Sequence, residues 1–138
     1  MRAIAGSDSR SLLSVTGALE AATGLALLVA PSTLVELLLG AAPGTPAGLT
    51  VSRMAGVAVL ALGAACWLAR DDAANRAAKG LIAAMLLYNV GVVAVLVLAW
   101  TGPGLFGIVF WPVVLGHTVL ATWCAACLLT RTHKERRS

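Results

Sequence analysis

Charged residues are scarce in this chain. Only 12% of its 138 residues are Asp, Glu, Lys or Arg, and 59% are hydrophobic, whereas ordinary globular domains are about 25% charged. Between residues 11 and 52 the only charged residues are Glu20 and Glu36, and residues 81–129 contain none. Such long uncharged segments exclude an ordinary water-soluble domain, so lipid is expected to be the main solvent of this chain.

The sequence also lacks the motifs of several catalytic classes. The glycines follow helical segments and turns, and none forms a phosphate-binding loop after a strand. No hydrolase triad and no pair of catalytic carboxylates is recognisable, and no second Cys or His pair completes a zinc site. No catalytic residue, metal or cofactor is therefore implied by motif, which favours a protein that is not an enzyme.

Helix breakers and charges divide the apolar sequence into four segments, each long enough to cross the hydrocarbon core of a bilayer. The predicted spans are about 12–30, 49–69, 80–100 and 107–129. Because the connections between them are short, neighbouring spans are expected to run antiparallel. The chain is thus predicted to be one all-α integral membrane domain, residues 1–138, built as an antiparallel four-transmembrane-helix bundle. Residues 130–138 are expected to form a basic cytoplasmic tail.

A short amphipathic helix is predicted between the first two spans. Pro31 is followed by STLVELLLG, in which Thr33 and Glu36 have the spacing of a capping box and Gly40 suits a C-terminal stop. This helix either lies flat in the membrane interface or continues the first span beyond a proline kink.

Lys and Arg lie almost entirely on one side of the predicted spans. Nine of the 10 do so: Arg2, Arg10, Arg70, Arg76, Lys79, Arg131, Lys134, Arg136 and Arg137. The two other connections, 31–48 and 101–106, contain neither residue type. The positive-inside rule then places both termini in the cytoplasm. The net charge of +4 is accordingly interpreted as a topology signal and not as a nucleic-acid-binding surface.

Four polar side chains inside the spans are not explained by topology: Glu20, Arg53, Asn89 and His117. At about 1.5 Å per residue, Glu20, Asn89 and His117 fall near one plane at mid-bilayer, with Arg53 roughly 8 Å closer to the outer side. Tyr88 neighbours the amide and completes this candidate ligand or proton site. A charge at the centre of a span costs roughly 2.5–3.5 kcal/mol, so these groups are expected to face the bundle interior.

Three interpretations of these residues remain open. They can form a purely structural polar cluster, in which Glu20 pairs with Arg53, and His117 pairs with Asn89 or Tyr88. They can bind a small or lipid-like ligand. Alternatively, Glu20 can exchange protons during transport, which requires that Arg53 points away and does not hold the carboxylate ionised.

Three cysteines provide a second candidate chemistry. Cys124 and Cys127 form a C-x-x-C motif near the cytoplasmic end of the fourth span, and Cys66 lies at a similar depth on the second. Such a pair can be a redox centre or half of a metal site. Here it lies within a continuous apolar helix that faces a reducing compartment. This context favours buried thiols that pack as small hydrophobic groups.

Several of these features also occur together in a known family. They are Glu20 in the first span, APSTLVELLLG after it, and SRMAGVAVLALGAACWLAR, with Arg53-x-x-Gly56, Gly63 and later His117. In this the chain resembles the small bacterial four-helix membrane proteins of the DoxX-like kind. The resemblance implies the bacterial inner membrane and, through some relatives, a link to quinone-dependent redox systems. Locally, GALEAATG is similar to small multidrug resistance exporters, which implies proton-coupled transport through the glutamate.

The predicted function is therefore that of a small multi-pass inner-membrane protein that binds a small or lipid-like ligand at its midplane site. It is expected to work in the lipid bilayer as a homo-oligomer or as an accessory subunit of a larger membrane complex, without nucleic acid. The alternatives are a proton-coupled small-molecule transporter that uses Glu20, and a membrane redox component that uses quinone.

Overall fold

The computed structural model describes residues 2–73 and 75–135, and this part of the chain is helical apart from its connections and contains no strand. Its α-helices are α1 (Arg2–Val29), α2 (Pro31–Leu39), α3 (Pro46–Ala69), α4 (Arg76–Thr101) and α5 (Phe110–Glu135). A short 3₁₀ helix, η1 (Arg70–Asp72), follows α3. The predicted all-α class is confirmed.

Four of these helices are long and apolar enough to cross a membrane. The qualifying segments are Asp8–Val29, Pro46–Asp72, Arg76–Thr101 and Phe110–Thr130. Their ends differ from those of the four predicted spans by one to four residues. Most of these ends lie further out than predicted, because a helix can continue through polar residues beyond the apolar segment, whereas the fourth span begins three residues later, at Phe110. For the same reason α5 continues to Glu135, into the predicted tail, whose residues 136–138 lie outside the described residues.

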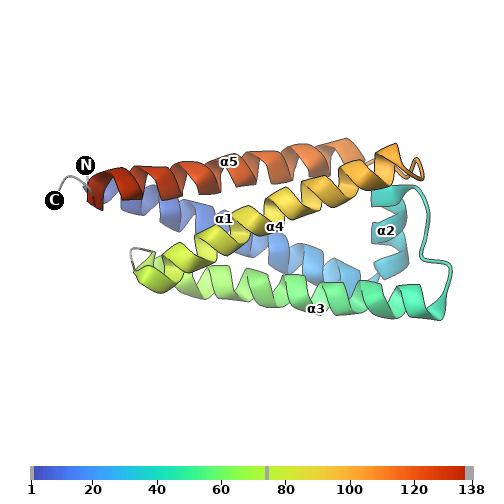
Figure 1. Ribbon diagram of the computed structural model, residues 1–138. Coiled ribbons are helices and arrows are strands. Elements are labelled where there is room, and N and C mark those ends of the chain that lie inside the picture. The colour runs from blue at the N-terminus through green and yellow to red at the C-terminus, as the bar shows by residue number, and fades with distance from the viewer. Residues whose placement is uncertain (1, 74, 136–138) are drawn as a thin grey trace.

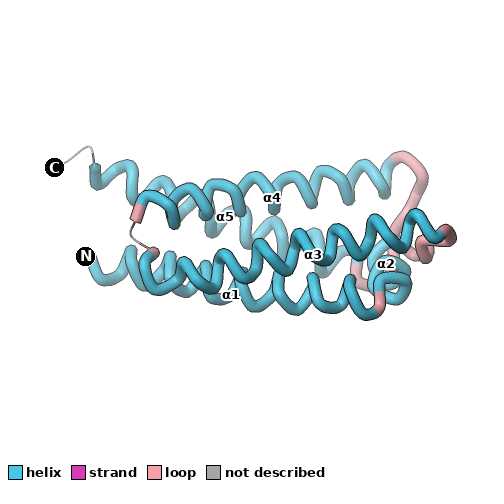
Figure 2. Tube along the Cα trace, turned by 90° about the horizontal axis from the view of Figure 1, so that it is seen from below, coloured by secondary structure: helices cyan, strands magenta, loops and turns pink. Residues whose placement is uncertain are grey.

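The chain reverses direction at each connection between long helices, so its two ends lie at the same end of the structure (Figure 1). The long helices associate mainly as two pairs, α1 with α3 and α4 with α5. Figure 2 shows the same structure from below, with α1 close beside α3. Contacts between the pairs are fewer, and they come mainly from α1 with α5.

Helices α1 and α3 touch backbone to backbone through four glycines. These are Gly17 and Gly24 on α1, and Gly56 and Gly63 on α3. A methyl group added at Gly24 would lie 2.5 Å from the backbone nitrogen of Leu60, and one at Gly63 would lie 2.6 Å from that of Ala21. Small residues allow such close approach where the hydrophobic effect cannot drive helices together, as in lipid.

Buried apolar side chains form two clusters at different levels of the structure. The terminal cluster, near the two chain ends, contains Leu12, Leu13, Cys66, Ala73, Ala78, Ile82, Met85, Leu120, Cys124 and Cys127. The distal cluster, towards α2, contains Leu96, Phe110 and Val114. On α4 and α5, the residues Asn89 and His117 lie between members of the two clusters. The polar site therefore sits at the level where the two apolar clusters meet.

Helix α2 lies across the end of the structure opposite the chain termini (Figure 1), so it does not continue the first span. The predicted short helix is confirmed, but its predicted capping box is wrong. The helix begins at Pro31 with Ala30 as N-cap, and no side chain caps it, so Thr33 is already inside the first turn. Gly40 is the predicted stop: its φ is 74°, and its N–H donates to the Glu36 carbonyl at 2.8 Å.

The connection between α4 and α5 is bound to the C-terminal end of α2. The Gly107 N–H donates to the Leu38 carbonyl at 2.8 Å, and the Val109 N–H donates to the Leu37 carbonyl at 3.1 Å. These bonds satisfy carbonyls that a helix end leaves without partners. They hold α2 over the space between the two helix pairs.

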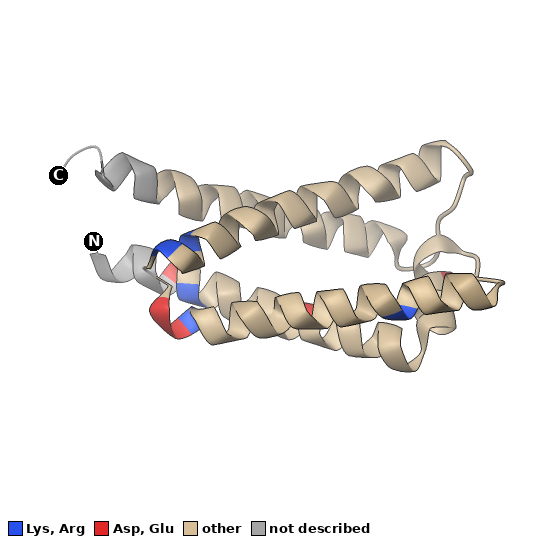
Figure 3. Ribbon diagram, turned by 60° about the horizontal axis from the view of Figure 1, so that its bottom comes forward, with Lys and Arg blue, Asp and Glu red and all other residues tan. Residues whose placement is uncertain are grey.

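Charged side chains gather at the end where the chain begins and ends (Figure 3). There Arg10 Nη2 lies 2.9 Å from Asp71 Oδ1, and Arg70 Nε lies 3.7 Å from the other oxygen of this carboxylate. The Arg70 guanidinium also covers the Trp67 ring at 3.9 Å from its centroid. Exposed ion pairs of this kind add little stability, but they connect η1 to the first helix.

Replacing Gly24 by Ala is expected to lower the free energy of unfolding by roughly 1–3 kcal/mol, because the new methyl group would collide with the α3 backbone. Gly91→Ala is the matched control, since a methyl group at this helical glycine meets nothing within 4 Å. Circular dichroism of both variants in detergent, followed during heating, measures the difference. Equal unfolding midpoints would contradict the close contact of α1 with α3.

Candidate functional site

The centre of the structure holds a buried carboxylate from α1. Glu20 is 3% exposed, and the Tyr88 hydroxyl on α4 donates a hydrogen bond to its Oε2 at 3.1 Å. The bond joins residues 68 positions apart in the chain. It links the helix pair α1–α3 to the pair α4–α5 at the level between the two apolar clusters.

Asn89, which follows Tyr88 on α4, forms a second polar pair with His117 on α5. The Asn89 amide nitrogen donates to the Met85 carbonyl at 2.7 Å, so its oxygen faces His117, whose Nδ1 lies 2.7 Å away. An amide oxygen can only accept a hydrogen bond, and we therefore infer that Nδ1 carries the proton. In the neutral ring the other nitrogen, Nε2, is then an acceptor.

The two polar pairs are in contact through their rings. The Tyr88 and His117 rings meet edge to face, with centroids 5.8 Å apart and an interplanar angle of 72°. Glu20, Tyr88, His117 and Asn89 thus form one continuous polar cluster drawn from α1, α4 and α5. Such partners stabilise the cluster because a buried polar group left without a hydrogen bond costs about 1–3 kcal/mol.

Arg53 does not belong to this cluster. Its side chain is exposed on α3, and within the described part of the chain no ion pair joins it to Glu20. On the same helix Gly56, Gly63 and Cys66 are buried. The structure therefore brings together four of the five predicted site residues and, within the part of the chain that it describes, leaves the Glu20 carboxylate without an ion pair.

A cavity of about 320 Å³ adjoins the polar cluster. Its polar lining comes from Glu20, Thr23, Tyr88 and His117, and aliphatic side chains of all five helices form most of the remaining wall. This volume equals that of roughly ten water molecules at about 30 Å³ each. It lies at the lower end of the range for small-molecule pockets, which are typically apolar with a few polar groups.

Sequence reasoning did not identify this cavity or several residues that shape it. Helix α2 contributes Leu34, Val35 and Leu38 to the wall, and Gly116 on α5 leaves space beside His117. The sequence signal for these α2 residues is the amphipathic character of the segment after Pro31, which predicts an apolar side without saying what that side contacts. In the sequence, the space beside the His117 ring is indicated only by the glycine that precedes it, Gly116, which has no side chain to fill that space.

The three cysteines belong to the terminal cluster. Cys66, Cys124 and Cys127 are free thiols, buried among apolar side chains of α1, α3, α4 and α5. Within the described residues, no group of three or more His, Cys, Asp or Glu side chains could hold a metal ion. The surroundings of these thiols are those of small hydrophobic side chains.

Replacing Asn89 by Leu is expected to lower the free energy of unfolding by roughly 1–3 kcal/mol, because His117 loses the partner of its buried Nδ1. Thr118→Val is the matched control: it removes one hydrogen bond, from Oγ1 to the Val114 carbonyl, on an exposed position of α5. Its effect should stay within about 0.5 kcal/mol. Denaturant unfolding in detergent compares the two, and an Asn89→Leu variant as stable as the control would exclude a stabilising Asn89–His117 bond.

Comparison of the chain with family models, with curated proteins and with solved structures finds no match. The DoxX-like resemblance therefore stays a prediction from the residues that carry it. The candidate site has to be interpreted from its own geometry.

Proposed function

We propose that this protein is a multi-pass protein of the bacterial cytoplasmic membrane whose helices form an antiparallel bundle with a binding cavity for a small or lipid-like molecule. The bound molecule would contact Glu20, Tyr88 and His117. The observation that carries this proposal is the cavity beside the polar cluster. A purely structural cluster needs no such space, because its members would satisfy one another in a packed interior.

Membrane insertion is supported by the four apolar helices and by the distribution of tryptophan. Trp67 near the end of α3 and the contacting pair Trp100–Trp111 near the α4–α5 connection are all partly exposed. Tryptophans at both ends of the spans suit the two membrane–water interfaces. The concentration of Lys and Arg near the two chain ends and between α3 and α4 supports cytoplasmic chain termini. Assembly as a homo-oligomer or with a larger complex is part of the same proposal.

A second candidate function is proton-coupled transport through Glu20. It is favoured by one observation: within the described residues the carboxylate is buried and has no ion pair. Ionisable groups inside a membrane protein commonly mark proton or substrate pathways. The signature of this function would be a Glu20→Gln variant that folds and reaches the membrane but loses proton-coupled flux.

The thiols, buried in the terminal cluster, support no redox role in either candidate, and quinone binding rests on the family resemblance alone.

Filling the cavity is expected to abolish binding without unfolding the protein. A methyl group added at Gly116 meets nothing within 4 Å although this residue lines the cavity, so Gly116→Leu should occupy that space. Native mass spectrometry of the purified protein should show a bound molecule on the wild type. The bound fraction should fall about tenfold in the variant, which corresponds to roughly 1.4 kcal/mol.

Gly80→Leu is the control for this experiment. Gly80 is likewise a helical glycine with open space around it, but it lines neither described pocket. This variant should retain the bound molecule at the wild-type level. A wild-type protein that carries no bound molecule, or equal retention by both leucine variants, would contradict a ligand in this cavity.

A further inference from the structure

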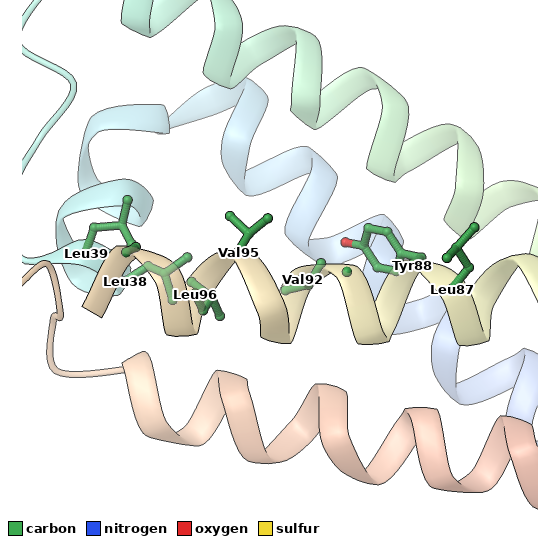
Figure 4. Close-up of a pocket in the computed structure, with 9 residues that line it drawn as sticks. Leu38, Leu39, Leu87, Tyr88, Val92, Val95 and Leu96 are labelled. Atoms are coloured by element: carbon green, nitrogen blue, oxygen red, sulfur yellow. The ribbon is translucent and has the colours of Figure 1, made fainter. Parts of the chain in front are cut away.

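The polar cavity has a second, apolar space as its neighbour. A groove of about 540 Å³ runs along α4 below the end of α2, lined by leucines, valines and small residues, with Tyr88 as its one polar side chain (Figure 4). Leu38, Tyr88 and Val92 line both the groove and the cavity. These three side chains form a shared wall between the two spaces.

The groove is open towards the outside of the helix bundle. Leu87 and Val95, which line it, are 75% and 64% exposed. Gly91 lies between them on α4 and leaves a hollow, because no atom would contact a methyl group at this position. In a bilayer this surface would face lipid chains, so the groove would be accessible from the side, next to the shared wall.

Tyr88 occupies the shared wall. Its ring lines the groove, and its hydroxyl donates to Glu20 on the cavity side. A ligand that occupied both spaces would pass Tyr88, and its polar end would come within reach of Glu20 and His117.

The polar groups of the cavity are mainly hydrogen-bond acceptors, and the Thr23 hydroxyl, which can also donate, is the exception beside Tyr88. An ionised Glu20 carboxylate only accepts, and the Nε2 of His117 is an acceptor because Nδ1 donates to Asn89. No Lys or Arg lines either space in the described part of the chain. A complementary ligand head must therefore donate hydrogen bonds. An anionic head would face the Glu20 carboxylate without a compensating cation.

We propose that the ligand is a single-chain aliphatic compound with a hydrogen-bond-donating head, a hydroxyl or an amine, that enters sideways from the membrane. Its head lies in the cavity against Glu20 and His117, and its chain lies in the groove along α4. This proposal rests on the proposed function and narrows it to a class of ligand and a direction of access. While Glu20 is ionised, an anionic head meets a like charge in the cavity, so anionic lipids and fatty acid anions are expected to bind more weakly.

The test uses the full chain in phosphatidylcholine nanodiscs and a 1-dodecanol probe with a photoreactive diazirine near the end of its chain. After illumination, peptide mass spectrometry locates the attachment sites. They are expected on the groove residues of α2 and α4, and Gly91→Leu should reduce this labelling about tenfold. Gly80→Leu is the control on the same helix and should leave labelling unchanged.

Competition with unlabelled compounds of equal chain length tests the head group. 1-Dodecanol and dodecylamine should suppress labelling at concentrations about tenfold lower than dodecanoate or dodecyl methyl ether, which have no donor at neutral pH. Stronger competition by the amine than by the alcohol would support the proposal and indicate that Glu20 is ionised. Equal competition by these two donors would support it with His117 Nε2 as the main acceptor.

Two results would overturn this inference. One is labelling spread evenly over the lipid-facing helices, and the other is competition by the ether or the carboxylate as strong as by the alcohol. The proposed function would survive either result if Gly116→Leu still removed the bound molecule while Gly80→Leu kept it. If the Gly116→Leu and Gly80→Leu variants also retained the bound molecule equally, the cavity would not be a binding site.

Discussion

The hydrogen bond from the Tyr88 hydroxyl to Glu20 crosses the junction between two helix pairs. On one side, α1 and α3 are fixed to each other by close contacts at four glycines. On the other side, the bond between Asn89 and His117 joins α4 to α5. Near the chain termini the pairs pack through the terminal cluster, and at the opposite end α2 and the α4–α5 connection cover the space between them. The cavity occupies the region that these contacts enclose.

Few polar groups determine the chemistry of the cavity, because most of its wall is aliphatic. The hydrogen bonds of Asn89 with Met85 and His117 set which histidine nitrogen remains available. The exposed position of Arg53 leaves Glu20 without a neutralising cation among the described residues. The same arrangement that stabilises the fold therefore presents acceptors, and no fixed positive charge, to any occupant.

Sequence alone predicted the four spans, the short helix after the first of them, and the common depth of Glu20, Asn89 and His117, because each follows from runs of residues counted along a helix. It could not give the rotation of α3, which decides whether Arg53 meets Glu20 or solvent. Arg53 is only three residues from the buried Gly56, so spacing allowed both outcomes. The Thr33 capping box failed because Pro31 starts the helix earlier. The cavity depends on how five helices meet, which no local pattern encodes.

A crystal structure determined from a lipidic phase would distinguish a ligand space beside Glu20 and His117 from a closed structural cluster that includes Arg53. We expect elongated density that reaches from the groove past Tyr88, with a polar end about 2.7–3.2 Å from the Glu20 carboxylate and His117 Nε2, and with Arg53 turned away. An Arg53–Glu20 ion pair, or a cavity closed by the protein's own side chains, would contradict this expectation.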